Sequence, residues 1–283
     1  MNKFNIAIVG YGFVGKAVAH GFATKHVEQH IVDPKGGLDI SELSSKRIDM
    51  TFVCVPTPMS DDGSIDASIA IETIKYLNDN VSGLIVLKST VTPDIVAKFA
   101  EQVDRFIYNP EFLTERNYAH DFEYPSLHVF GGKKHSCELL HSFYTDYSIC
   151  HPCPVHYVGA KEASLIKYGI NSFLATKVTW FNEYYKTVNK FNANFDNVAS
   201  AMASDPRIGT SHMQVPGHDG RMGFGGACFT KDCNALISLT KNLGCEMELL
   251  TNAVNLNNSI RSQYTELDDR EKEQNVKYTK EKK

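Results

Sequence analysis

Short runs of β-forming residues alternate with helical patterns over the first 159 residues of the chain. The runs that we interpret as strands are 4–9, 30–32, 49–55, 84–87, 106–108, 127–130 and 155–158. Helical patterns lie between them, and Asp66 and Pro93 are residues typical of helix starts. Repeated strand–helix units predict a doubly wound, mostly parallel α/β sheet of the Rossmann type.

The pattern changes to helices alone after Gly159. Residues 161–191 carry apolar side chains at helical spacing without an internal proline, which predicts one helix of roughly 46 Å. Shorter helical stretches follow, and the glycine-rich segment 210–226 has no periodicity. We therefore expect an NAD-binding domain at 1–159 and an all-helical middle domain, with a cysteine loop, at 160–264. The nearly all polar residues 265–283 predict a disordered tail.

A dinucleotide-binding fingerprint follows the first strand. Gly10, Gly12 and Gly15 form GxGxxG between a strand and a helix, with Asp33 at the end of the second strand. Gly12 lets a pyrophosphate approach the helix N-terminus, and Asp33 can accept hydrogen bonds from ribose hydroxyls and repel a 2′-phosphate. This context favours NAD over NADP. Nearby Lys35 complicates that choice, although a solvated turn lysine is the simpler interpretation. The predicted contacts also include Tyr11, Phe13, Val14 and Lys35.

Polar residues cluster where predicted strands end. Thr57, Thr90, Glu111 and Glu115 each follow a strand, and parallel sheets bind ligands outside the carboxyl ends of their strands. Each residue alone would be read as a cap or a surface residue, so their shared position is the informative feature.

Three glycines precede a cysteine in GFGGACFTKD, residues 223–232. Glycines allow a backbone to approach a ligand closely. Cys228 has Lys231 and Asp232 nearby in sequence, and a thiol beside a cation can act as a nucleophile. A buried cysteine beside a glycine turn is the competing interpretation.

The charge and the cysteine content of the chain limit which binding partners and which cellular compartment are expected. The net charge is −4 and there is no basic block before the tail, so nucleic acid and anionic membranes are not expected as partners. No transmembrane run or signal peptide is visible, and seven cysteines without a regular framework indicate a reducing cytoplasm. The pair Cys150 and Cys153 forms a lone CxxC, which is weak evidence for a zinc or redox site, so no metal is expected.

Several spaced motifs together resemble the nucleotide-sugar dehydrogenases of the UDP-glucose/GDP-mannose dehydrogenase family, most closely the UDP-glucose 6-dehydrogenases. The matching motifs are GYGFVG, VCVPTP, KSTV, NPEFLTE, KYGIN with SFLATK, DPRIG and GFGGACFTKD, in the family's order over residues 1 to about 260. The resemblance implies a Rossmann domain followed by a helical domain whose long helix, 161–191, forms a homodimer. It also implies that a UDP-sugar, expected to be UDP-glucose, is oxidised to UDP-glucuronate with NAD in two successive hydride transfers, which serves polysaccharide biosynthesis.

The family's mechanism implies roles for matched residues. Cys228 would be the nucleophile that forms a thiohemiacetal and then a thioester. Lys167 and Asn171, spaced i, i+4, would stabilise the oxyanion, although a solvated helix lysine is the usual interpretation. Glu111 would be the acid/base for thioester hydrolysis, with Thr90 and Asp232 holding the water. The expected substrate contacts are Glu111, Phe112, Leu113, Glu115, Lys167, Asn171, Arg207 and Gly225. Glu115, Lys231, Thr57 and Thr90 would also contact NAD.

The chain departs from the family pattern in three places. Ser164 stands where the family commonly has Glu, and Thr230 replaces the usual Pro. The chain also reads as a short form without the third, nucleotide-binding domain, which leaves the nucleotide and sugar open. Loop 211–221 looks longer than usual and could compensate. Two alternatives stay open: a single-step hydroxy-acid or sugar-acid dehydrogenase, and a non-catalytic NAD-binding module.

Overall fold

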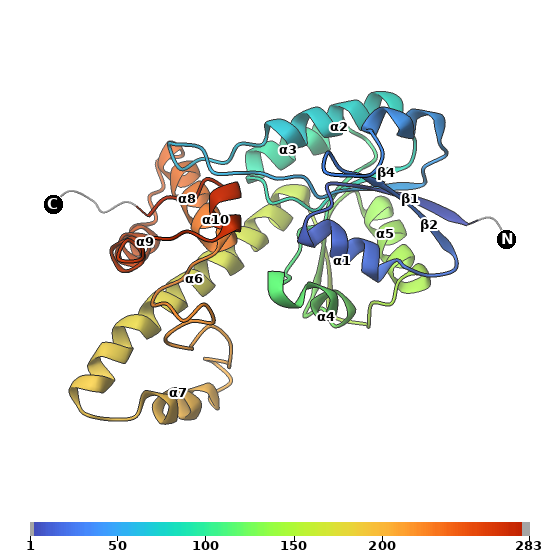
Figure 1. The fold of residues 1–283 in the computed structure, drawn as a ribbon. Helices are drawn as coiled ribbons and strands as arrows, with labels where there is room; N and C mark the ends of the chain where they lie inside the picture. The colour runs from blue at the N-terminus through green and yellow to red at the C-terminus, as the bar shows by residue number, and fades with distance from the viewer. Residues whose placement is uncertain (1–2, 279–283) are drawn as a thin grey trace. The chain divides into compact units, whose positions relative to one another are not determined.

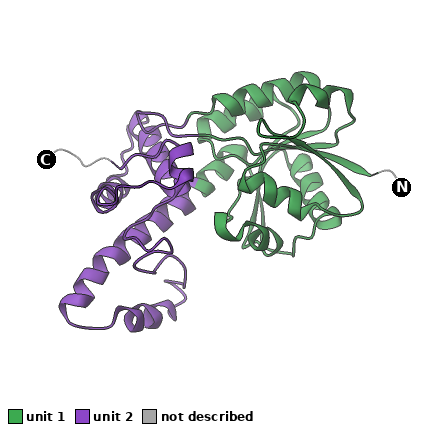
Figure 2. Ribbon diagram, in the orientation of Figure 1, with its two compact units in different colours: residues 1–57, 66–167 green, residues 58–65, 168–283 purple. Residues whose placement is uncertain are grey.

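Two compact units make up the chain in a computed structural model that describes residues 3–278 (Figure 2). Unit 1 comprises 1–57 and 66–167, and unit 2 comprises 58–65 and 168–283. This division differs from the predicted boundary after Gly159. The first part of the long helix belongs to unit 1, because Ala160 and Ala163 pack into the core of that unit. The short segment 58–65 belongs to unit 2.

Unit 1 is built on a seven-stranded sheet in the order β2-β1-β3-β4-β5-β6-β7. All neighbouring strands pair in parallel except β5 and β6, which are antiparallel. The strand order reverses between β1 and β3, and this switch point is where such sheets bind ligands. The strands are β1 (Phe4–Val9), β2 (Val27–Val32), β3 (Met50–Val53), β4 (Leu84–Leu87), β5 (Phe106–Tyr108), β6 (His128–Gly132) and β7 (Val155–Val158).

Helices cover both faces of this sheet (Figure 1). One core contains side chains of α2 and α3, such as Ile74 and Phe99, and the other contains side chains of α1 and α5, such as Val18 and Leu140. The doubly wound α/β fold predicted from the alternating pattern is therefore confirmed. The helices are α1 (Phe13–Gly21), η1 (Ile40–Ser45), α2 (Ser68–Asn80), α3 (Pro93–Gln102), η2 (Glu115–Asn117), α4 (Tyr118–Glu123) and α5 (Lys134–Tyr147).

Unit 2 is helical and contains most of the long helix α6 (Ala160–Lys190). Phe181 and Val188 of α6 pack with Phe195 of α7 and with Met213 and Val215 in one hydrophobic core. No helix within residues 3–278 has the length and apolar character that crossing a membrane requires. The remaining helices are α7 (Phe195–Ala203), α8 (Ala227–Asn242), α9 (Glu248–Arg261) and α10 (Asp269–Glu273).

The prediction of disorder from residue 265 onward is wrong for residues 265–278. Asp268 caps α10 with a capping box, and Glu271, Gln274 and Val276 are buried. The backbone N–H of Met59 donates to the carbonyl of Gln274, so this segment packs within unit 2. Residues 279–283 lie outside the described part of the chain. A composition rule averages over the segment and misses that a few of its polar side chains are buried and paired.

An aromatic cluster on the α1/α5 face of the sheet encloses His128. The centroid of its ring lies 5.4 Å from the ring centroid of Phe130 and 4.7 Å from that of Tyr144. Its Nε2 lies 3.2 Å from Cys150 Sγ. Burial, with smaller contributions from the charges of Lys88 and His141, lowers the pKa of His128 to about 3. The imidazole is therefore neutral in the folded protein at pH values where the unfolded chain takes up a proton.

We predict that His128→Gln weakens the acid sensitivity of folding. The folded-state pKa of about 3 lies below the unfolded value of 6.5, so the wild type loses stability as the pH falls from 6.5 towards 3. Urea unfolding at pH 7, 5.5 and 4.5 should show a smaller loss of unfolding free energy for the variant than for the wild type. Equal losses in the two proteins would contradict the assignment.

Candidate active site

The fingerprint glycines form a backbone cradle between β1 and α1. Gly10 has φ of 92°, and a Cβ there would lie 2.6 Å from the Cys54 carbonyl oxygen. A Cβ on Gly15 would lie 2.0 Å from the carbonyl oxygen of Gly10. Gly12 is the N-cap of α1, has no side-chain cap, and has no atom within 4 Å of the position of a Cβ. The uncapped helix N-terminus therefore suits a pyrophosphate.

Asp33 lies at the end of β2 beside this cradle. Its Oδ2 accepts from the Tyr11 backbone N–H at 2.6 Å, and its Oδ1 accepts from the Lys35 N–H at 2.8 Å. These bonds fix the carboxylate next to the glycine turn, and each oxygen keeps further acceptor capacity. The exposed Lys35 thus supports Asp33 through its backbone.

Two predicted cofactor contacts meet after β3 and β4. The Thr57 hydroxyl donates to the Thr90 carbonyl at 3.0 Å, and both residues are buried. Ser89 Oγ donates to the carbonyl of Val55 at 2.7 Å. The two strand ends that carry Thr57 and Thr90 are therefore joined by side-chain hydrogen bonds.

A buried ion pair joins Glu111 to Lys167. Lys167 Nζ lies 3.2 Å from Glu111 Oε1 and donates to the Glu111 carbonyl at 2.6 Å. Glu111 Oε2 accepts from the Leu113 N–H at 2.6 Å, and the Phe112 ring centroid lies 5.3 Å from the lysine nitrogen. Lys167 is thus not the solvated helix lysine of the simpler interpretation, because only 3% of it is exposed.

The loop after β5 also depends on residues that the sequence did not single out. Asn109 Oδ1 accepts from Lys88 Nζ at 2.9 Å and from Tyr144 OH at 3.0 Å, and its Nδ2 donates to Val129 O. Burial lowers the pKa of Lys88 to about 8. Lys88 lies in KSTV and Asn109 in NPEFLTE, so motif membership was the available signal. A pocket beside this loop is lined by residues that include Lys88, Glu111, Leu113, Asp121, His128 and Tyr144.

The remaining predicted residues of this loop differ in exposure. Phe112 and Leu113 are half-buried, whereas Glu115 is exposed and begins η2. Thr114 anchors the turn, because its N–H and hydroxyl both donate to Asp121 Oδ2 at 2.8 and 2.6 Å.

In unit 2, Cys228 lies in the first turn of α8, which begins at Ala227. The prediction of a cysteine loop is therefore corrected: the loop ends at Gly226, and Cys228 belongs to the start of a helix. Cys228 is partly exposed, while Cys233 on the same helix is fully buried. Burial raises the pKa of the Cys233 thiol. A partly exposed thiol at a helix N-terminus has the environment of reactive cysteines.

Three polar side chains of α8 and α6 are buried in contact with one another in unit 2. Lys231 Nζ lies 2.6 Å from Asp232 Oδ1, and Asn171 Nδ2 donates to Asp232 Oδ2 at 2.6 Å. All three are at most 6% exposed. Asp232 thus organises two of the residues that the resemblance places in the reaction.

The glycine segment before Cys228 is held by side chains that sequence reasoning missed. The Gly223 N–H donates to Asn182 Oδ1 at 2.8 Å. Asn257 Oδ1 accepts from the Phe224 N–H at 2.7 Å, and its Nδ2 donates to the Phe224 carbonyl at 3.0 Å. Side chains of α6 and α9 therefore replace a regular backbone ladder here.

Arg207 is set apart from these contacts within unit 2. Its guanidinium pairs with Asp205 through Nε–Oδ1 and Nη2–Oδ2 distances of 3.0 and 2.6 Å, and its side chain is 87% exposed. Gly225 is half-buried in the glycine segment. Within residues 3–278 no group of three or more His, Cys, Asp or Glu side chains is placed to hold a metal ion.

Comparison with known proteins matches both parts of the chain to domains of one enzyme family. Residues 35–148 match the NAD binding domain of the UDP-glucose/GDP-mannose dehydrogenase family, and residues 161–259 match its central domain. The chain belongs to this family. NAD, the cofactor expected from Asp33, agrees with the first of these matches.

Individual relatives agree with this assignment. The chain is 36% identical over 228 residues to UDP-glucose 6-dehydrogenase of Rickettsia bellii, covering 75% of this chain and 50% of that protein. It is 27% identical over 299 residues to UDP-glucose 6-dehydrogenase YwqF of Bacillus subtilis, covering 90% and 66%. The structure of a UDP-glucose dehydrogenase from Pyrobaculum islandicum superimposes with a TM-score of 0.76 at 27% identity, covering 91% of this chain and 68% of that one. The chain thus spans about half to two thirds of these curated relatives.

We predict that Asp33→Ala reduces the preference for NAD over NADP. The carboxylate beside the Tyr11 N–H would repel a 2′-phosphate and would accept from a ribose hydroxyl, so its loss should weaken NAD binding by about 1–3 kcal/mol and spare NADP. Titration of both cofactors into wild type and variant measures this. Asp79→Ala, which removes an exposed carboxylate of α2, is the matched control. An unchanged ratio of the two affinities in Asp33→Ala would contradict the assignment.

Proposed function

We propose that this chain carries out an NAD-dependent oxidation of UDP-glucose to UDP-glucuronate, with Cys228 as the covalent nucleophile. One observation carries the proposal: in a member of this family, the only cysteine of GFGGACFTKD is partly exposed in the first turn of α8, followed by the buried Lys231–Asp232 pair. We further propose that it acts in the cytoplasm, on the basis of the cysteine pattern, and supplies uronic acid for polysaccharide synthesis.

The reaction removes four electrons from one carbon. Bound NAD would supply the hydride acceptor for both oxidations. In the first, the primary alcohol loses a hydride and its hydroxyl proton and becomes an aldehyde. The Cys228 sulfur then bonds to the aldehyde carbon, and the thiol proton is transferred to the aldehyde oxygen. The product is a thiohemiacetal. Loss of the second hydride and of the hydroxyl proton leaves a thioester. Water adds to its carbonyl carbon and gives up a proton, the carbon–sulfur bond breaks, and the leaving sulfur takes up a proton. The carboxylate product forms and the Cys228 thiol is regenerated.

Negative charge develops on a substrate oxygen in each of these steps. The cation of the Lys167–Glu111 pair in unit 1 can stabilise that charge. Lys167 is held at 3.2 Å from Glu111, so a cation is already fixed before substrate binds. Removal of one preorganised oxyanion donor typically costs about 2.7–4 kcal/mol of transition-state stabilisation. Glu111 then serves as the proton acceptor for the hydrolytic water, while Lys167 stays beside it.

The network in unit 2 supports Asn171 and the water. Asp232 accepts from Asn171 Nδ2, which orients the amide and leaves its other N–H for an oxyanion. Lys231 neutralises Asp232 at 2.6 Å. We propose that Lys231, Thr57, Thr90 and Glu115 contribute to cofactor binding, and that Arg207, Phe112, Leu113 and Gly225 contribute to binding of the sugar nucleotide.

We predict that the wild type forms two NADH for each UDP-glucose consumed, and that Cys228→Ser abolishes formation of the acid. A serine hydroxyl is far less ionised than a thiol near neutral pH, so the addition to the aldehyde fails. NADH absorbance together with chromatography of the UDP-sugars measures both quantities, and Cys245→Ser, at an exposed cysteine, is the control. One NADH for each substrate would indicate a single-step dehydrogenase, and none a cofactor-binding module.

We also propose a homodimer through α6. Within unit 2, the helix leaves Phe173 and Trp180 69% and 48% exposed, and Phe191 just beyond it is 80% exposed. Phe173 and Trp180 are seven residues apart, so they lie on one side of the helix. Exposed aromatic side chains in a row are typical of a protein interface.

We predict a dimer for the wild type and a monomer for the double variant Phe173→Glu, Trp180→Glu. Two carboxylates placed in an apolar interface would be buried without partners, which opposes association. Light scattering at micromolar concentrations distinguishes the two states. Leu249→Glu, at a 75% exposed apolar residue outside α6, is the matched control and should stay dimeric. A monomeric wild type would contradict the proposal.

A further inference from the structure

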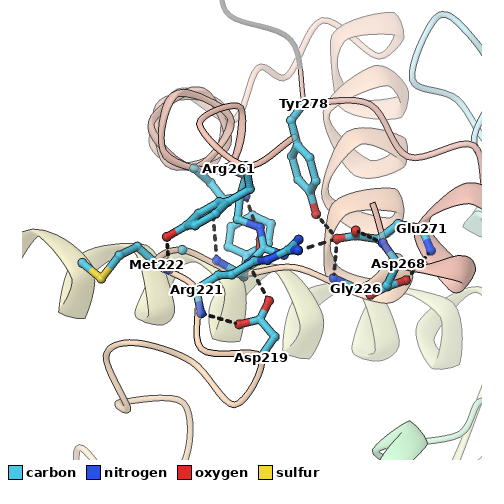
Figure 3. Close-up of polar contacts among 12 residues, drawn as sticks. Asp219, Arg221, Met222, Gly226, Arg261, Asp268, Glu271 and Tyr278 are labelled. Atoms are coloured by element: carbon cyan, nitrogen blue, oxygen red, sulfur yellow. Dashed lines mark hydrogen bonds and ion pairs between the residues drawn. The ribbon is translucent and has the colours of Figure 1, made fainter. Parts of the chain in front are cut away.

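Glu271 is a buried carboxylate in the segment for which the sequence predicted disorder. It is 0% exposed, and its Oε1 accepts from the Gly226 N–H at 3.0 Å and from Tyr278 OH at 2.6 Å. Its Oε2 accepts from the Asp268 N–H at 2.9 Å. Arg261 Nη2 lies 3.4 Å from Oε1 (Figure 3). A short helix near the end of the described chain thus contacts the residue immediately before α8.

Arg261 extends these contacts to the glycine-rich loop. Its Nη1 lies 2.6 Å from Asp219 Oδ2, and Asp219 Oδ1 accepts from the Arg221 N–H at 3.0 Å (Figure 3). A Cβ on Gly225 would lie 1.9 Å from Arg261 Nη2. The guanidinium therefore occupies the space that a side chain at 225 would need, between an anion of the loop and an anion of α10.

The buried negative charge of Glu271 is paired with the positive charge of Arg261. Burial alone would raise the pKa of Glu271, but the hydrogen bonds from Tyr278, Asp268 and Gly226 and the charge of Arg261 together lower it. Glu271 is thus an anion at neutral pH, and the Arg261 guanidinium is a cation in contact with it. Breaking one partner of a buried pair leaves the other charge uncompensated.

We propose that Glu271 is a positioning residue for Cys228. Gly226 is the N-cap of α8 and has φ of 77°, and Cys228 is two residues further on. By accepting the Gly226 N–H and holding Arg261 against Gly225, Glu271 sets the direction in which α8 starts and hence the direction of the thiol. Residues 265–278 then belong to the scaffold of the reaction. This inference rests on the proposed function of Cys228.

The two oxidations of the proposed reaction separate positioning from general stability. The first step, from alcohol to aldehyde, does not use the thiol, whereas oxidation of the aldehyde requires it. Supplying UDP-glucose measures the first step in a single turnover, and supplying the 6-aldehyde of UDP-glucose measures the second alone. A variant that merely lowers the amount of folded protein reduces both rates by the same factor.

The test compares Glu271→Gln with Glu273→Gln. Glutamine keeps the shape at 271 but removes the charge that pairs with Arg261, while Glu273 is an exposed residue of the same helix that pairs with Arg270. We expect Glu271→Gln to slow the aldehyde oxidation by about tenfold or more, a loss typical of a displaced reacting group. The first oxidation and NAD binding should change less than about twofold. Glu273→Gln should leave both steps unchanged.

Equal slowing of both steps, or slowing of neither, would overturn the inference. If Glu271→Gln does not fold, Tyr278→Phe provides a second test, because it removes one hydrogen bond to the same Oε1. It should also slow only the aldehyde oxidation, by a smaller factor. Loss of selectivity in that variant would also overturn it. Failure of the proposed function is seen separately, because Cys228→Ser would then still oxidise the supplied aldehyde.

Discussion

Charged side chains that leave water need partners, and this constraint governs each part of the candidate site. Lys167 is buried against Glu111, Lys231 against Asp232, and Arg261 between Asp219 and Glu271. An unpaired charge at any of these positions would carry a desolvation penalty of several kcal/mol. Each pair therefore fixes the backbone that carries its two members, and those backbones carry the reactive groups.

The same constraint explains the glycines. A large polar side chain can pack directly against the backbone where no Cβ intervenes, as the Arg261 guanidinium does beside Gly225. The glycine segment is thus a contact surface for side chains of α6, α9 and α10, as well as a place where a ligand can approach. The sequence pattern suggested only the second use, because the partners of the glycines lie far away in the chain.

The fold was predictable to the extent that it depends on local patterns. The alternation of β-forming runs with helical stretches correctly predicted the sheet, and Pro93 begins α3 as expected. GxGxxG before Asp33 predicted the cradle that the structure contains. These features depend on residues close together in sequence, where periodicity and cap residues carry the information.

Most of the errors concern contacts between residues that are distant in sequence. Glu271 and Tyr278 stand in a polar stretch whose composition is that of a disordered tail, and only their pairing with Arg261 and Gly226 makes them part of the core. Similarly, nothing near Lys88 indicates that Asn109 and Tyr144 would surround it. Cys228 was placed in a loop because glycines precede it, although α8 begins at Ala227.

In the proposed reaction, Cys228 forms a covalent acyl intermediate. The most direct measurement is mass spectrometry of Glu111→Gln after mixing with NAD and UDP-glucose, because loss of the base should leave the thioester unhydrolysed. We predict a mass increase equal to one UDP-glucuronyl group, located on the peptide that contains Cys228 and removed by hydroxylamine. Formation of two NADH by the wild type, with no adduct on Cys228 in the variant, would contradict the account.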